Sequence, residues 1–139
     1  GAIIAVNNSL NMAGLKATDI HYINLHGTGT KLNDSMEGKV TYGIFGGNIP
    51  CSSSKSLTGH TLGASGIIEA AFCWLLLSSE NKEKKLPIHY GDNILDPEIP
   101  PILLCQPNMH FPPAKTWYTL SNSFAFGGNN GSIILGKSN

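Results

Sequence analysis

Apolar positions in the first part of the chain predict a helix followed by a strand. Ala2–Met12 has the apolar spacing of a helix and stops at Gly14, which suits a helix C-cap. Ile20–Leu25 is a short apolar stretch typical of a buried strand, and it runs directly into His26. We therefore expect this histidine at the carboxyl end of a strand.

The next stretch predicts a second helix and a second strand. Asp34 suits a helix N-cap, with Glu37 as its reciprocal partner, and this helix should extend to about Phe45. Ile49–Ser54 is expected to form a short strand, with Lys55 at its exit. Both strands thus end at a residue that can carry chemistry.

The stretch Ala64–Ser78 predicts a helix whose apolar residues spread around its whole circumference. This distribution is typical of a helix that is covered on every side. Glu69 is the exception, because a carboxylate in apolar surroundings is costly unless it meets a cation or hydrogen-bond donors. We expect Lys55 or a bound ion beside it.

The second half of the chain is rich in proline and predicts fewer regular elements. Two short strands are expected, around Ile88 and around Leu103, followed by a closing pair at Trp117–Ser121 and Ser132–Leu135. Helices alternating with strands predict a layered α/β fold with a mixed sheet. A helix that is covered on both sides needs a second sheet or further helices beyond one such sheet. We therefore expect the chain to be an incomplete part of a larger fold.

Composition narrows the classes of function. The 139 residues are 41% hydrophobic and 13% charged, as expected for a globular domain with a modest core. All nine basic residues are lysines, so no guanidinium is present for bidentate binding of phosphates or bases, and nucleic acid is not an expected partner. The longest apolar run, Ala70–Leu77, is too short to cross a membrane.

The cysteines and histidines show no metal-binding or disulfide pattern. Cys51, Cys73 and Cys105 are odd in number and widely spaced, which suits neither a disulfide framework nor a zinc site. The five histidines form no metal-ligand motif. We therefore expect a protein of the reducing cytoplasm without a bound metal.

Two glycine-framed histidines are the main candidates for chemistry. His26 lies in HGTGT, and His60 lies in KSLTGHTLGASG, after Lys55. Each follows a strand-like stretch at a turn, where a rigid scaffold can present an imidazole to a substrate. A single loop histidine is commonly satisfied by backbone hydrogen bonds, but two such motifs in one short chain favour an active site.

Three motifs together resemble a known family. HGTGT with Asp34 and Glu37, KSLTGHTLGASG with Glu69, and NSFAFGGNN at residues 122–130 resemble the C-terminal half of elongating β-ketoacyl-[acyl-carrier-protein] synthases. The resemblance covers nearly the whole chain and implies the thiolase fold, in which helices lie buried between two sheets. It makes residues 1–139 an incomplete C-terminal domain, with the nucleophilic cysteine in the absent N-terminal half.

The resemblance also implies a reaction. Enzymes of this family carry out a decarboxylative Claisen condensation of malonyl-[acyl-carrier-protein] with an acyl-cysteine, in fatty acid, polyketide or polyene synthesis. His26 and His60 match the two histidines that stabilise the enolate oxygen. Lys55 matches a lysine whose positive charge keeps a neighbouring imidazole neutral.

The resemblance also implies substrate-binding or structural roles for other residues of the motifs. Thr28 and Thr30 match hydroxyls that bind the pantetheine arm, and Phe126 matches an aromatic gate whose backbone N–H helps to form an oxyanion hole; Phe124 is assigned to substrate binding beside it. The residues assigned to structural support are Glu69, Asp34, Glu37 and Asn122. The resemblance implies no cofactor, apart from a structural monovalent cation that some family members bind near the residue matching Glu69.

The implied partners are acyl carrier protein, the N-terminal half of the same fold and a second copy of the full-length protein. The isolated chain is expected to be inactive. One alternative is a non-catalytic chain-length subunit of a synthase heterodimer, although such a subunit has no reason to keep both histidines. Another is a serine acyl-enzyme hydrolase, because Ser52–Lys55 spells S-x-x-K; that enzyme class needs its serine at a helix start and needs two further motifs that this chain lacks.

Overall fold

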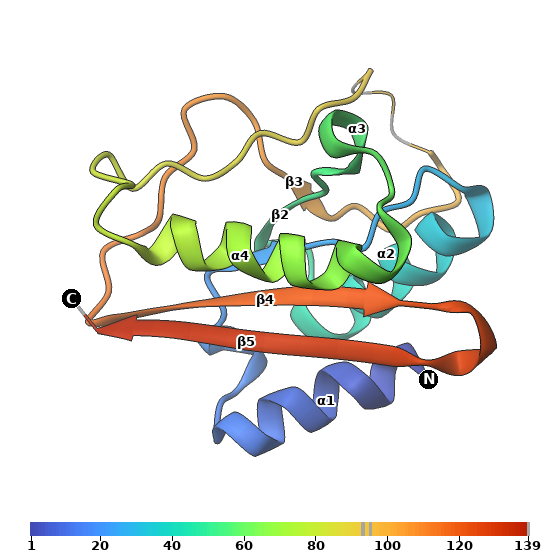
Figure 1. Cartoon of the computed structure of the whole chain (residues 1–139), viewed down its shortest axis with the longest axis horizontal. Helices are drawn as coiled ribbons and strands as arrows, with labels where there is room; N and C mark the ends of the chain where they lie inside the picture. Colours follow the sequence, from blue (N-terminus) through green and yellow to red (C-terminus); the bar gives the residue numbers. More distant parts are fainter. Residues whose placement is uncertain (93, 95, 139) are drawn as a thin grey trace.

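The computed structural model describes residues 1–92, 94 and 96–138, with only the backbone of Phe126, and shows three layers (Figure 1). A mixed five-stranded sheet with the order β3-β2-β1-β4-β5 forms the middle layer. Helices α1 (Ala2–Ala13) and α2 (Lys31–Phe45) cover one face, and α4 (Ser65–Leu77) covers the other. The layered α/β architecture is as expected from the sequence.

Four of the five strands are parallel. They are β1 (Tyr22–Asn24), β2 (Pro50–Ser52), β3 (Leu103–Leu104) and β4 (Thr116–Phe124), and β5 (Asn130–Ser138) pairs antiparallel with β4. In register, Asn24 lies opposite Ser52 on one side and Ser121 on the other. Because parallel strands share a direction, the residues that follow β1, β2 and β4 meet at one edge of the sheet.

Each face of the sheet has its own hydrophobic core. The core under α1 and α2 contains Val6 and Ile23, whereas the core under α4 contains Tyr22, Cys73 and Trp117. Tyr22 and Ile23 are consecutive in β1 and point to opposite faces, as the pleat of a strand requires. Strand β1 is therefore buried on both sides, whereas the edge strand β5 has no fully buried residue.

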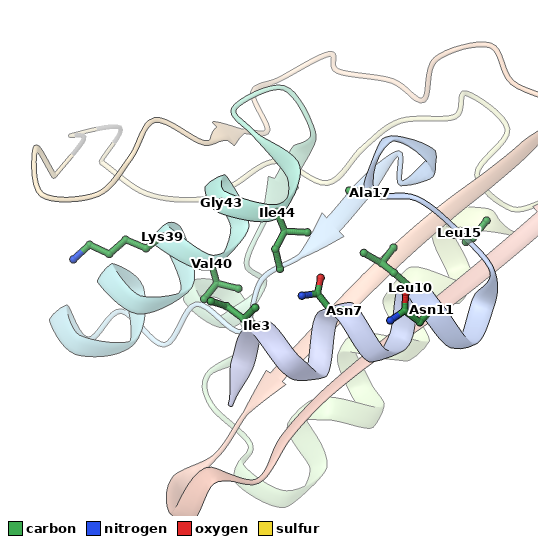
Figure 2. Close-up of a pocket in the computed structure, with 10 residues that line it drawn as sticks. All are labelled: Ile3, Asn7, Leu10, Asn11, Leu15, Ala17, Lys39, Val40, Gly43 and Ile44. Carbon is green, nitrogen blue, oxygen red and sulfur yellow. The ribbon is translucent and has the colours of Figure 1, made fainter.

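Helices α1 and α2 pack side by side on their face of the sheet. Helix α1 ends at Gly14, whose φ of 66° is the left-handed conformation expected of a C-cap. A groove of about 620 Å³ runs between the two helices (Figure 2). Ile3 and Leu10 of α1 face Val40 and Ile44 of α2 across it.

Helix α4 departs from the expectation that it is covered on every side. Its inner face is buried on β4 and β5, but Ile67, Trp74 and Leu75 are exposed by 70%, 63% and 45%. Gly66 lets α4 approach the sheet closely, since a Cβ there would lie 2.8 Å from the Ser123 hydroxyl. Within the described residues the helix therefore has one covered face and one apolar, exposed face.

The proline-rich segment contains less strand than expected. Leu103 lies in β3 as expected, but no strand forms around Ile88 in the described part of the chain. The backbone there makes separate hydrogen bonds instead, such as His89 N–H to the Cys105 carbonyl at 2.8 Å. Pro87 has no N–H to donate, which prevents a continuous ladder.

The remaining elements are short. Helix α3 (Lys55–Thr58) is a single turn, and 3-10 turns occupy Ala17–Asp19, Leu62–Ala64 and Phe126–Gly128. Among the described residues, no helix is both long enough and apolar enough to cross a membrane.

Candidate functional site

The two glycine-framed histidines meet at the carboxyl edge of the parallel strands. His26 follows β1, and His60 follows α3, which itself begins shortly after β2. Their ring centroids lie 5.3 Å apart with the planes nearly perpendicular, at 85°. Phe124, at the end of β4, packs its ring against His26 at 6.1 Å. The parallel topology thus brings together residues that are far apart in the sequence.

The two imidazoles differ in burial. His26 is only 5% exposed, whereas His60 is exposed. Burial, the positive charge of Lys55 and the neighbouring His60 together lower the pKa of His26 to about 4, and burial has the largest effect. Nδ1 of His26 is buried and has no hydrogen-bond partner among the described residues. His26 is therefore a neutral imidazole with an unused ring nitrogen.

The backbone that carries His26 is held by Glu37 of α2. The Glu37 carboxylate accepts hydrogen bonds from the N–H groups of His26 at 2.8 Å and Gly27 at 2.7 Å. Asn122 of β4 donates to the same carboxylate at 3.5 Å and accepts from the Ser132 hydroxyl at 3.0 Å. Glu37 and Asn122 thus fix the turn after β1.

The start of α2 differs from the prediction. The helix begins at Lys31 with Thr30 as N-cap residue, so Asp34 lies in its first turn and does not cap it. The expected reciprocal pair of Asp34 and Glu37 is wrong, because Glu37 reaches back to the turn after β1. Burial raises the pKa of Glu37 to about 7, although the three hydrogen bonds that it accepts favour its charged form.

Lys55 and Glu69 form a buried ion pair. The Lys55 ammonium donates to Glu69 Oε1, and both side chains are almost fully buried. Burial raises the pKa of Glu69, and the Lys55 charge opposes that shift. This pair confirms the expectation that Lys55 or an ion would lie beside Glu69, and it ties the start of α3 to α4.

A cavity of about 730 Å³ opens beside the histidines, which is within the usual size of small-ligand sites. Thr28, Lys55 and His60 are among its lining residues. The Thr28 and Thr30 hydroxyls are hydrogen-bonded to each other at 2.9 Å near this cavity. The cavity therefore has room for a substrate at His60, whose ring contacts His26.

The two aromatic residues of the last motif are placed differently. Phe124 is buried and supports the ring of His26, so in this structure it packs within the core. The side chain of Phe126 lies outside the described part of the chain. Its backbone begins a 3-10 turn in which Gly127 and Gly128 have φ values of 74° and 82°, which only glycine adopts easily.

Ser52 has no lysine to activate it. Its hydroxyl is buried and hydrogen-bonded to the Tyr22 hydroxyl at 2.7 Å, while the Lys55 amine pairs with Glu69. Ser52 also ends β2 and does not begin a helix. The arrangement of a serine acyl-enzyme hydrolase is therefore absent at these residues.

The cysteines are buried thiols. Burial raises the pKa of Cys73 and Cys105 to about 12 and that of Cys51 even higher. None is a thiolate near neutral pH, so none suits the role of nucleophile. In the described part of the chain, no three His, Cys, Asp or Glu side chains are grouped closely enough to hold a metal ion.

Sequence reasoning missed two residues of the site, Ser53 and His89. The Ser53 hydroxyl donates to the Gly27 carbonyl at 3.0 Å, and the Ser53 N–H donates to His89 Nδ1 at 3.2 Å. His89 also lines the cavity beside His60. Neither residue lies in a glycine-framed motif, and His89 comes from the proline-rich segment, so the sequence pattern contains no signal for their proximity.

Gly27 allows the two loops to cross closely, which gives a first prediction. Its φ is 42°, and a Cβ there would lie 2.5 Å from Ser53 Cβ. Gly27→Ala should therefore lower the free energy of unfolding by about 2 to 3 kcal/mol through overlap and backbone strain. Gly29→Ala is the matched control, because Gly29 also has a positive φ but no described atom lies within 4 Å of its Cβ position.

Denaturant unfolding of both variants tests this prediction. Gly29→Ala should cost about 1 kcal/mol, from the positive φ alone. Equal losses in the two variants would contradict the close packing of Gly27 on Ser53.

Comparison with known proteins identifies the family and the fold of this chain. Residues 1–88 match the family described as "Beta-ketoacyl synthase, C-terminal domain". The chain is 32% identical over 140 residues to the mitochondrial 3-oxoacyl-[acyl-carrier-protein] synthase of Arabidopsis thaliana, covering 97% of this chain and 29% of that protein.

Two solved structures show the same fold. One is the ketosynthase in complex with its chain length factor from Xenorhabdus doucetiae, with a TM-score of 0.85 and 50% identity over 100% of this chain and 33% of that chain. The other is a β-ketoacyl synthase from Burkholderia phymatum, with a TM-score of 0.86 and 34% identity over 99% of this chain and 32% of that chain. The chain spans about a third of the length of these relatives and belongs to the family of β-ketoacyl synthase C-terminal domains.

Proposed function

We propose that this chain is the C-terminal part of a 3-oxoacyl-[acyl-carrier-protein] synthase and that it supplies the histidine pair for decarboxylation of malonyl-[acyl-carrier-protein]. The observation that carries the proposal is the contact between neutral, buried His26 and His60 beside a cavity. Neutral imidazoles can donate N–H groups to an oxygen that becomes negatively charged. Two donors at one oxygen form an oxyanion hole.

The proposed step has a simple electron balance. The bond between the malonyl carboxylate and the α-carbon breaks, carbon dioxide leaves, and the electron pair moves toward the thioester carbonyl to give an enolate. Imidazole N–H groups of His26 and His60 stabilise the enolate oxygen. The α-carbon then attacks the acyl-cysteine thioester, which forms the new carbon–carbon bond and expels the cysteine thiolate. That cysteine comes from the N-terminal half.

Lys55 acts on this step through its charge. Its ammonium lowers the pKa of His26, which keeps this imidazole neutral as the enolate forms. The buried pair with Glu69 fixes the ammonium, so Lys55 is a positioning residue that need not touch the substrate. Thr28, on the cavity wall, is suited to hydrogen-bond the pantetheine arm.

The exposed face of α4 is suited to pack against the N-terminal half of the fold. Trp74 is 63% exposed there, next to Leu75 and Ile67. In the full-length synthase, Trp74→Glu should lower the free energy of unfolding by about 3 kcal/mol or more, because it buries a charge in that contact. Met12→Glu is the control, since Met12 is 90% exposed at the end of α1, and it should change stability by less than about 0.5 kcal/mol.

Thermal and denaturant unfolding of the full-length protein measure this effect. A Trp74→Glu variant as stable as Met12→Glu would show that the α4 face is not covered in the full-length protein.

A second candidate is supported by the similarity to the ketosynthase and chain length factor complex. In that case the chain belongs to one subunit of a heterodimer, and a non-catalytic subunit would lack the nucleophilic cysteine. The neutral His26 and its contact with His60 favour the catalytic role.

A condensation assay tests the proposed function. The full-length protein, with malonyl- and acyl-[acyl-carrier-protein], should release one carbon dioxide for each 3-oxoacyl product formed. If the folded protein forms neither product, even with a partner ketosynthase subunit added, the catalytic proposal is rejected and the non-catalytic subunit remains.

A further inference from the structure

His89 is a third imidazole of the same cavity and belongs to none of the motifs. Its backbone N–H donates to the Cys105 carbonyl at 2.8 Å, and its Nδ1 accepts from the Ser53 N–H at 3.2 Å. Both ends of the residue are thus fixed, the main chain by the strand region near β3 and the ring by the turn after β2.

The hydrogen bond from Ser53 determines the tautomer of His89. Because Nδ1 accepts this hydrogen bond, it carries no proton itself, and the neutral ring has its proton on Nε2. Burial lowers the pKa of His89, and the nearby carboxylate of Asp34 opposes this shift. The ring thus offers one N–H donor at Nε2, and the described residues provide no hydrogen-bond acceptor for it.

The surroundings of His89 limit what it can bind. His89, Lys55 and His60 line one cavity, whose other lining residues include apolar Ile102 and Leu104. Asp34 lies in the same lining and would repel an anionic group. A donor beside an apolar wall and a carboxylate suits an uncharged carbonyl oxygen.

We propose that His89 Nε2–H donates a hydrogen bond to an amide carbonyl of the substrate's pantetheine arm. This inference rests on the proposed function, because it takes the cavity as the path of the thioester arm. Ser53 couples the two parts of the site: its N–H orients His89, and its hydroxyl binds the carbonyl of Gly27, directly after His26. The arm would therefore be held in a fixed relation to the histidine pair.

Two substitutions separate substrate binding from a merely structural role. In His89→Asn, the amide oxygen can replace Nδ1 as the acceptor for Ser53, but no donor reaches the Nε2 position. In His89→Gln, the longer amide can place a donor near the Nε2 position, but the acceptor for Ser53 is lost. Asparagine therefore preserves the structural bond, and glutamine preserves the proposed substrate bond.

Binding of pantetheine to the full-length protein is measured first, because it requires no chemistry. His89→Asn should weaken binding roughly five- to tenfold with an unchanged melting temperature, as expected for one lost hydrogen bond. His89→Gln should bind within about twofold of wild type although it melts at a lower temperature. The proposal would be overturned if His89→Asn bound pantetheine as tightly as wild type. It would also be overturned if, in both variants, the loss of affinity were proportional to the fall in melting temperature.

Decarboxylation of model thioesters then locates the contact. For malonyl-pantetheine, His89→Asn should raise KM by the same factor with kcat nearly unchanged. For malonyl-ethanethiol, which has no amide, KM should not change. An equal rise for both thioesters would contradict the assigned amide contact. If wild type binds pantetheine through His89 but decarboxylates neither thioester, the proposed function fails while the binding role stands.

Discussion

Replacement of either His26 or His60 by alanine is expected to lower malonyl-[acyl-carrier-protein] decarboxylation by about 10²- to 10³-fold, the loss typical for one donor of an oxyanion hole. The two rings lie 5.3 Å apart between centroids, so both can face one oxygen. Transfer of an acyl group to the synthase cysteine should remain largely intact, because that step does not form the enolate. Carbon dioxide release and acyl-enzyme formation are measured separately.

His110→Ala is the control for this pair. His110 is exposed and lies in the proline-rich segment, and its removal should leave both half-reactions unchanged. A decarboxylation rate that is the same in wild type, His26→Ala and His60→Ala would contradict the assigned role of the pair. Equal loss of both half-reactions would instead indicate that the variants are misfolded.

The low pKa of His26 adds a dependence on pH. Because its folded-state pKa of about 4 lies below the ordinary histidine pKa of 6.5, its contribution to stability is present above pH 6.5 and is lost as the pH falls toward 4. Across neutral pH the ring stays uncharged, so protonation of His26 should not limit decarboxylation there. Lys55→Met should raise the pKa of His26, since it removes a positive charge that lowers it.

Breaking the buried pair of Lys55 and Glu69 is expected to have the largest effect on stability. Lys55→Met should lower the free energy of unfolding by about 3 to 5 kcal/mol, because it leaves a buried carboxylate without its cation. The double variant Lys55→Met with Glu69→Leu should recover most of this loss, since it removes both charges. Denaturant unfolding of wild type, both single variants and the double variant measures the coupling.

An exposed ion pair provides the comparison. Lys85 and Glu83 also pair, but both side chains are more than half exposed, so Lys85→Met should lower the free energy of unfolding far less than Lys55→Met does. A similar small loss for Lys55→Met, or a double variant less stable than either single variant, would show that the pair does not contribute to stability as its burial implies.

Much of the site follows from local sequence and strand direction. His26 comes shortly after β1 and Lys55 shortly after β2, and parallel neighbours place their carboxyl ends at the same edge. The need of Glu69 for a cation also follows from its apolar neighbours, and Lys55 meets that need. The placement of His26 and Lys55 and the pairing of Glu69 could be predicted because each depends on a single helix or strand and on the residues that follow it in the sequence.

Other features depend on contacts that no local pattern encodes. The sequence pattern predicts that Glu37 helps to cap its own helix, yet its carboxylate accepts from the backbone N–H groups of His26 and Gly27. His89 joins the site through a backbone hydrogen bond across the end of the sheet, and its segment has no regular periodicity. The exposed face of α4 has the composition of a core, so its apolar pattern alone could not show where its covering layer lies.

The central claim is that the imidazoles of His26 and His60 hold one and the same oxygen. A structure of the full-length synthase with a non-decarboxylating malonyl amide analogue tests it most directly. We expect the analogue's carbonyl oxygen to lie about 3 Å from a ring nitrogen of each histidine. A carbonyl oxygen bound by only one of the two rings, or by neither, would contradict it.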